Sequence, residues 1–204
     1  MINSANIERE YIMGQYYTPI IIRGNSKQSF YSHNYNNGLK LMEHSYIGNT
    51  FVETVLRQIF KNKARLAWVG DYAEPEDVEQ DKELVEKFIQ IERTENDKKY
   101  RRKPEAVGEF ENSMYLVFIN HTKKQYLVIN EYLTKNQVMD KWGMIAHPIP
   151  LLTAIGNGKG GGDYRGSNMS DIGLWACDVI EANFEIPKNY TNITSGIRFV
   201  EGEE

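Results

Sequence analysis

The stretch from residue 50 to residue 70 reads TFVETVLRQIFKNKARLAWVG, an amphipathic segment followed by a short apolar run. The apolar residues of its first half recur with a 3.6-residue period, which predicts a helix with one buried face. Thr50 and Glu53 have the spacing of a capping box, so we expect the helix to begin there. Residues 65–69 form an apolar run that ends at Gly70, which is typical of a buried strand. The rest of the fold prediction starts from this helix and strand.

Upstream of residue 50 the chain is mainly strand-like. Segments 16–23 and 28–33 are rich in aromatic and β-branched residues and flank the turn sequence Gly24-Asn25-Ser26, which predicts a hairpin. Segment 39–45 is a candidate third strand.

Downstream, segment 78–93 has a second amphipathic pattern and predicts a second helix. Segments 113–120 and 125–132 flank a polar turn and predict a second hairpin, and 174–180 favours a strand over a short helix. Hairpins at both ends with two helices between them do not form a regular βαβ series. The sequence therefore predicts an α+β fold with a mixed, mainly antiparallel sheet and two principal helices.

Length and charge limit the class of protein. The chain has 204 residues and a net charge of −4, and we expect an N-terminal extension (1–12) before a single globular domain (13–204). The acidic balance makes nucleic acid an unlikely partner, because phosphate binding favours basic proteins. No secretory signal or membrane-spanning segment is evident, which favours a cytoplasmic protein. Cys177 is the single cysteine, so no internal disulfide is possible, and we expect it to be buried.

The segment from 156 to 166, GNGKGGGDYRG, contains six glycines. Glycine lets backbone N–H groups approach an anion closely, and Lys159 and Arg165 add positive charge. The sequence following the last glycine does not open a helix as a dinucleotide fingerprint would, and Ser or Thr is absent after Lys159, so Walker A does not fit. The segment is either a flexible connection or an anion-binding loop, and in the second case its ligand-binding residues are Gly158, Lys159, Gly160, Gly161, Gly162 and Arg165.

The tripeptide Gly-Asp-Tyr occurs at 70–72 and again at 162–164, each time shortly after an apolar segment. If both strand ends share one edge of the sheet, Asp71 and Asp163 can bind a metal or take part in acid–base chemistry; otherwise they are ordinary turn residues. His44 and His147 are the histidines that we place in the same hypothetical cleft as catalytic residues. The tyrosines that we expect to contact a ligand there are Tyr46, Tyr72 and Tyr164. Histidine and cysteine spacing predicts no metal site, and no cofactor is expected.

Several sequence blocks are similar to a family of uncharacterised bacterial and phage-borne proteins. The blocks are 13–17 (MGQYY), 37–46 (NGLKLMEHSY), 68–72 (WVGDY), 120–125 (NHTKKQ), 147–154 (HPIPLLTA) and 160–164 (GGGDY). Residues 1–12 have no counterpart, which is expected if translation starts at Met13. The resemblance implies no activity, but its phage or mobile-element setting suggests an accessory or anti-defence role.

Three functions are compatible with these patterns. The first is a binding protein that sequesters a small anionic or nucleotide ligand or inhibits a host defence protein. The second is a hydrolase of phosphodiester or glycosidic bonds that uses the two aspartates and two histidines named above as acid–base residues. The third is a protein-interaction module whose acidic segment 76–97 forms the contact face.

Overall fold

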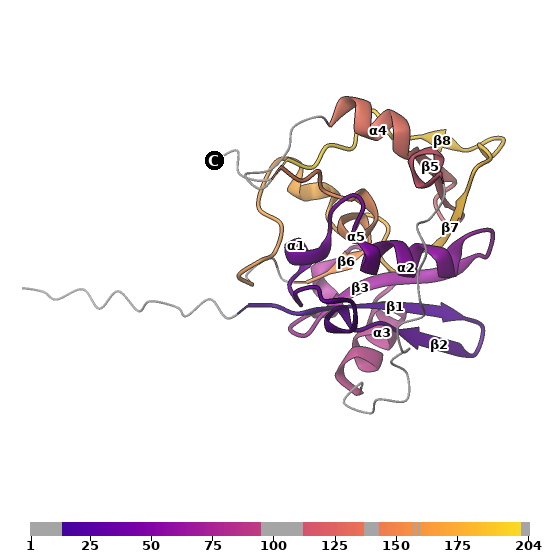
Figure 1. Cartoon of the computed structure of the whole chain (residues 1–204). Helices are drawn as coiled ribbons and strands as arrows, with labels where there is room; N and C mark the ends of the chain where they lie inside the picture. The colour runs from indigo at the N-terminus through magenta and orange to yellow at the C-terminus, as the bar shows by residue number, and fades with distance from the viewer. Residues whose placement is uncertain (1–13, 95–111, 137–142, 157, 159, 201–204) are drawn as a thin grey trace, which may run out of the picture.

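The computed structural model describes residues 14–94, 112–136, 143–156, 158 and 160–200 (Figure 1). The expected N-terminal extension, 1–12, lies outside the described residues. The strands are β1 (Tyr17–Arg23), β2 (Ser26–Ser29), β3 (Ala64–Gly70), β4 (Val117–Asn120), β5 (Gln125–Val128), β6 (Ala154–Ile155), β7 (Val179–Asn183) and β8 (Thr191–Asn192). The α-helices are α1 (Leu41–His44), α2 (Thr50–Ile59), α3 (Lys82–Thr94), α4 (Ile129–Lys135) and α5 (Pro148–Leu152). Short 3₁₀ turns are η1 (Ser32–Tyr35), η2 (Pro75–Asp77), η4 (Ser113–Tyr115) and η5 (Met169–Asp171).

The described strands form one sheet in the order β2-β1-β3-β7-β4-β5-β8, with the short β6 beside β3. The pairs β3–β6 and β5–β8 are parallel, and the other pairs are antiparallel. The predicted α+β class and the mixed, mainly antiparallel sheet are therefore confirmed. Hydrogen bonding places β3 next to β7, far along the chain, so the two hairpins belong to one continuous sheet.

Each face of the sheet has its own apolar core. Leu66 and Trp68 of β3 belong to a large core that also contains α2 and α5. Ala67 and Val69, which alternate with them, belong to a smaller core under α3. In Figure 1, α1, α2 and α5 lie on one side of β1 and β3, and α3 lies on the other. Arg65 is two residues before Ala67 in β3, so its side chain leaves the sheet on the same face, the one covered by α3.

The sequence pattern locates the two principal helices well. In α2, the buried residues include Phe51, Val55 and Ile59, which form the predicted apolar face. The cap lies one residue earlier than expected, because the Asn49 side chain accepts hydrogen bonds from the N–H groups of Phe51 and Val52 at 2.9 and 3.2 Å. Helix α3 buries Val85, Phe88, Ile89 and Ile91 against the sheet and begins four residues after the predicted boundary.

Five predicted strands differ from the structure in whole or in part. Segment 28–33 is strand only up to Ser29 and then enters η1, and segment 113–120 begins with η4 before β4. In the other three, turns or a helix replace strand. In segment 39–45 the Glu43 carboxylate accepts the Lys40 N–H at 3.1 Å and starts α1. In segment 125–132 the strand stops at Val128, and the chain continues as α4. In segment 174–180 successive turns precede β7, and Cys177 has a φ of 61°. Cys177 is fully buried, as expected, and burial raises the pKa of its thiol.

In the parts of the chain that the structure describes, no helix is long and apolar enough to cross a membrane.

Candidate functional site

The two Gly-Asp-Tyr segments meet at the beginning of β1. Tyr16 donates its N–H to Asp71 Oδ1 at 3.0 Å and accepts the Asp71 N–H at the same distance. The buried Tyr17 has a raised pKa because of burial first and then the nearby Asp163 charge, with a smaller contribution from Asp71. Both carboxylates therefore lie in the electrostatic neighbourhood of one tyrosine hydroxyl, which agrees with the expectation that these segments share one edge of the sheet.

The glycine-rich segment packs closely against Gln15 at this edge. A side chain on Gly160 would meet the Gln15 backbone nitrogen at 2.7 Å, so only glycine allows this approach. The Gly160 N–H donates to Asp163 Oδ2 at 2.9 Å, and the Gly162 carbonyl accepts the Met42 N–H at 3.0 Å. These two contacts attach the segment to its own aspartate and to α1.

Asp163 has one satisfied and one unsatisfied oxygen. The Tyr17 hydroxyl lies near this carboxylate but donates to Gln15 Oε1 at 2.9 Å. Within the described residues, Asp163 Oδ1 and Gln15 Nε2 are buried without a hydrogen-bond partner. Burial raises the pKa of Asp163, which is 4% exposed.

His44 is held by two internal partners. Its Nε2 accepts the Trp68 indole N–H at 3.2 Å, so its Nδ1 carries the proton and donates to the Gly38 carbonyl at 3.1 Å. Burial lowers the pKa of His44 to about 4, which keeps the ring neutral. Because both nitrogens are engaged inside the core, the structure gives His44 a structural role, in contrast to the general base suggested by the sequence.

His147 caps helix α5. Its Nδ1 accepts the Ile149 N–H at 3.2 Å, and its ring meets Phe118 edge-on at 5.6 Å between centroids. Burial lowers the pKa of His147 to about 3. The His147 N–H donates to the Ser45 carbonyl, so the two predicted histidines lie in neighbouring segments. Their rings bond to different groups, His44 to Trp68 and His147 to the Ile149 N–H.

The remaining predicted ligand-binding residues are dispersed. Tyr164 is 1% exposed. Its hydroxyl lies within hydrogen-bond distance of two backbone carbonyls, those of Ser167 (2.7 Å) and Val200 (3.1 Å), so Tyr164 is a core residue. Tyr46 is half-buried and pairs with Ala146 in an isolated bridge. The other positions are exposed or half-buried (Tyr72, Gly158, Gly161 and Arg165), whereas Lys159 lies outside the described residues.

A different set of residues forms a row across the sheet on the α3 side. Ile22 of β1 is paired with Arg65 of β3, and Arg65 is paired with Val179 of β7. The His121 N–H donates to the Val179 carbonyl at 2.8 Å, which extends the β4–β7 register by one residue. Side chains directly opposite one another in antiparallel strands lie on the same face, so these four side chains share one face.

A pocket of about 290 Å³ lies along this row, between the end of β1, the start of β3 and helix α3. Four cationic side chains line it, together with apolar residues and Gly24, and no carboxylate is among its described lining residues. We call it the cationic pocket, and its charged residues are Arg23, Lys63, Arg65 and Lys87. This concentration of positive charge contrasts with the net charge of −4 of the whole chain.

Backbone carbonyls orient the two arginines, and Arg65 also interacts electrostatically with the buried Asp178 carboxylate. Arg23 donates to the carbonyls of Gln58 at 2.8 Å and Lys63 at 3.2 Å, and Arg65 donates to the Cys177 carbonyl at 3.0 Å. Within the described residues, none of the four cations of the pocket forms an ion pair. The pocket therefore presents fixed positive charge that an anion could compensate.

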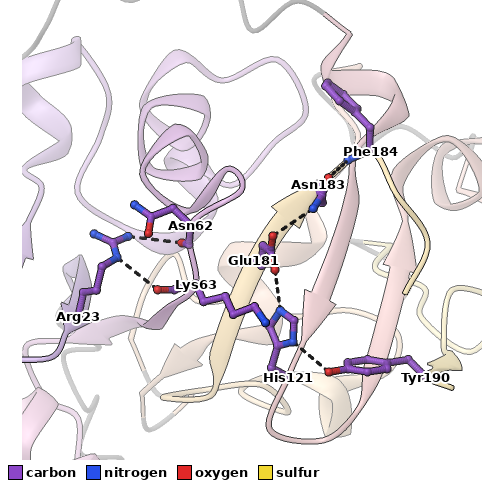
Figure 2. Close-up of polar contacts among 8 residues, drawn as sticks. All are labelled: Arg23, Asn62, Lys63, His121, Glu181, Asn183, Phe184 and Tyr190. Atoms are coloured by element: carbon purple, nitrogen blue, oxygen red, sulfur yellow. Dashed lines mark hydrogen bonds and ion pairs between the residues drawn. The ribbon is translucent and has the colours of Figure 1, made fainter. Parts of the chain in front are cut away.

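A second polar group lies at the end of the same row. His121 Nε2 lies 2.8 Å from Glu181 Oε2, and His121 Nδ1 lies 3.0 Å from the Tyr190 hydroxyl. Asn183 donates to the other Glu181 oxygen at 3.1 Å. Figure 2 shows this chain of bonds together with Arg23 and its contacts at Asn62 and Lys63. We call His121, Glu181 and Tyr190 the His121 triad.

The sequence contained weak signals for these residues. Arg65 interrupts an otherwise apolar strand, which is unusual for a buried segment. His121 lies at a hairpin turn, where histidine is unremarkable, and its partners are 60 and 69 positions away. The pairing of β4 with β7 brings Glu181 beside His121, and the pairing of β5 with β8 brings Tyr190 there.

No family model, no curated protein and no solved structure matches the chain. Within the described residues, no group of three or more His, Cys, Asp or Glu side chains is arranged to hold a metal ion. The cationic pocket and the His121 triad are therefore the features from which we infer a function.

Proposed function

We propose that the chain binds a small anionic ligand, of the nucleotide class, in the cationic pocket. The observation that carries the proposal is the gathering of four cations around one pocket, with no carboxylate among the described lining residues. Guanidinium and ammonium groups are the side chains that proteins use to bind phosphate oxygens. The volume of about 290 Å³ suits a phosphate group with part of its attached sugar, at the small end of ligand pockets.

The apolar floor of the pocket supports the same assignment. Ile22 and Leu84 line it beside the charged groups and provide an apolar surface for the sugar or base of a nucleotide. We place the proposed anion site in this pocket and not in the glycine-rich segment, because four cationic side chains gather in the pocket, whereas the Gly160 N–H and the Asp163 carboxylate of the segment bond to each other.

The biological setting remains a prediction from the sequence blocks. Their resemblance suggests that binding serves a phage or mobile element in the cytoplasm, by sequestering a ligand or by inhibiting a host defence protein. The first of these two roles requires the pocket directly.

Thermal unfolding of the full chain with AMP, ADP and inorganic pyrophosphate tests the proposal. A ligand at 100 times its dissociation constant adds about 2.7 kcal/mol to the free energy of unfolding and raises Tm. The double variant Lys63→Glu/Lys87→Glu should weaken binding by at least about tenfold, equivalent to about 1.4 kcal/mol. Both lysines are exposed and form no ion pair within the described residues, so the variant should fold.

Lys135→Glu is the matched control, because Lys135 is an exposed helical lysine that does not line the cationic pocket. It should leave the ligand-induced rise in Tm unchanged. Equal effects of this control and the double variant would contradict the proposal, as would the absence of a Tm shift with every probe.

A further inference from the structure

We propose that the His121 triad hydrolyses a phosphodiester whose second phosphate group is held in the cationic pocket. The inference rests on the proposed anion-binding function and adds a reaction to it. The residues differ from the acid–base set that the sequence suggested, because His44 and His147 are engaged in the core.

The triad has the geometry of an activated nucleophile. The Tyr190 hydroxyl lies 3.0 Å from His121 Nδ1, within reach for proton transfer, and Tyr190 is half-buried. Glu181 lies 2.8 Å from His121 Nε2 and fixes the ring so that Nδ1 can accept a proton. A nucleophile, a base and a group that orients the base are the three parts that covalent catalysis requires.

The supporting groups hold this arrangement in place. Glu181 is 8% exposed, and its second oxygen accepts the Asn183 side-chain N–H at 3.1 Å. The His121 and Tyr190 rings also meet edge-on, with centroids 5.7 Å apart. Glu181 is therefore a positioning residue, whereas Tyr190 and His121 would touch the reacting phosphate or its leaving group.

The sheet fixes how far the triad lies from the cationic pocket. His121 is opposite Val179, which lines the pocket, and the next position in the row is Arg65. Adjacent strands are about 4.8 Å apart, so the backbones of His121 and Arg65 are separated by two such steps, about 10 Å. A molecule with two phosphate groups can place one in the pocket and the other at Tyr190, which a single inorganic phosphate cannot do.

The reaction balances without a further reactant except water. The Tyr190 oxygen attacks the phosphorus and transfers its proton to His121 Nδ1, and the imidazolium that forms is stabilised by Glu181. The bond from phosphorus to the leaving alcohol breaks, and His121 returns the proton to the alcohol oxygen. Water then attacks the phosphotyrosyl group, gives its proton to His121, and the tyrosine oxygen leaves and recovers that proton. One phosphodiester and one water give one alcohol and one phosphomonoester.

The experiment uses the full chain with the dinucleotide pApA, which has a terminal phosphate and one phosphodiester, and with ApA, which lacks the terminal phosphate. We expect cleavage of pApA and slower cleavage of ApA. Tyr190→Phe and His121→Asn should each lower cleavage by at least about a hundredfold, whereas pApA binding should still depend mainly on Lys63 and Lys87 of the cationic pocket. Glu181→Gln keeps a hydrogen-bond acceptor and should lower kcat with KM unchanged.

Tyr126→Phe is the matched control, because Tyr126 is a half-buried tyrosine of the adjacent strand β5 and does not take part in the bonds of the triad. It should cleave at the original rate. Mass spectrometry of acid-quenched protein should find a nucleotide adduct on the peptide that contains Tyr190.

The outcomes separate the two proposals. Binding of pApA that depends on Lys63 and Lys87, without cleavage, overturns the hydrolytic inference and leaves the proposed function intact. Cleavage that persists in Tyr190→Phe also overturns the inference. Failure of pApA to bind contradicts both proposals.

Discussion

The indole N–H of Trp68 donates to Nε2 of His44 across 3.2 Å in the interior of the protein. Both side chains are fully buried, and the other ring nitrogen of His44 donates to the Gly38 carbonyl. This bond links the central strand β3 to α1 and fixes the proton of His44 on Nδ1.

Removing this acceptor should destabilise the fold. His44→Phe leaves the Trp68 N–H and the Gly38 carbonyl without partners, so the free energy of unfolding should fall by about 1–3 kcal/mol. His44→Gln places an amide oxygen where it can accept the indole N–H, so its free energy of unfolding should fall by less than that of His44→Phe. Urea unfolding at pH 7 measures both variants, and equal losses would argue against the Trp68 bond as the cause.

Acid should destabilise the protein through its buried histidines. The pKa of His44 is lowered to about 4 and that of His147 to about 3, whereas the ordinary histidine value is 6.5. Since the unfolded chain takes up these protons first, the stabilising contribution is complete above pH 6.5 and is lost as the pH falls toward 4 and 3. Each histidine contributes about 1.4 kcal/mol per pH unit within its window.

His147→Asn isolates one of these contributions, because asparagine is a good helix cap and does not titrate. Between pH 6 and pH 4, the slope of the free energy of unfolding against pH should be smaller by about 1.4 kcal/mol per unit than in the original chain. Urea titrations at several pH values provide the comparison. An unchanged slope would show that His147 titrates in the folded protein as it does when unfolded.

Asp163→Asn should stabilise the protein at neutral pH. The pKa of Asp163 is raised by burial, so the folded state disfavours its charge. The cost of the charge is absent below the unfolded pKa of about 3.9 and grows as the pH rises through the folded value. The gain in unfolding free energy should be about 1 kcal/mol at pH 7, typical of relieving one buried polar atom, and should vanish below pH 3.9. A loss of stability at pH 7 would indicate that the charged form makes a necessary contact.

Gly160→Ala tests the close packing of the glycine-rich segment. The new methyl group would meet the Gln15 backbone nitrogen at 2.7 Å, and overpacking of this kind costs about 1–3 kcal/mol. Gly196→Ala is the matched control, because its nearest atom would be the Ile193 oxygen at 3.6 Å, an ordinary contact. The control should change the unfolding free energy by less than about 0.5 kcal/mol. If both variants unfold at the same urea concentration, the segment is not packed as described.

The regular elements followed from local patterns in the sequence. Helices α2 and α3 were predicted because their apolar residues repeat with the period of a helix, and the first hairpin because a turn sequence separates two β-rich runs. The predicted strand at 39–45 was wrong, because the Glu43 carboxylate bonds to the Lys40 N–H and closes a helical turn that periodicity does not reveal. The repeated Gly-Asp-Tyr tripeptide suggested that 70–72 and 162–164 share one edge of the sheet, and the charges of Asp71 and Asp163 do both act on Tyr17.

By itself, the sequence determined the α+β class, the two principal helices and the burial of Cys177, because these depend on hydrophobic period and on residues close together in the chain. Only the tertiary structure decided which polar residues meet. Arg23 reaches Lys63 and Gln58, Arg65 lies beside Val179, and His121 bonds to Glu181 and Tyr190, all through strand pairings between distant segments. Register between such strands depends on the packing of both sheet faces at once, and no local pattern in the chain encodes that choice.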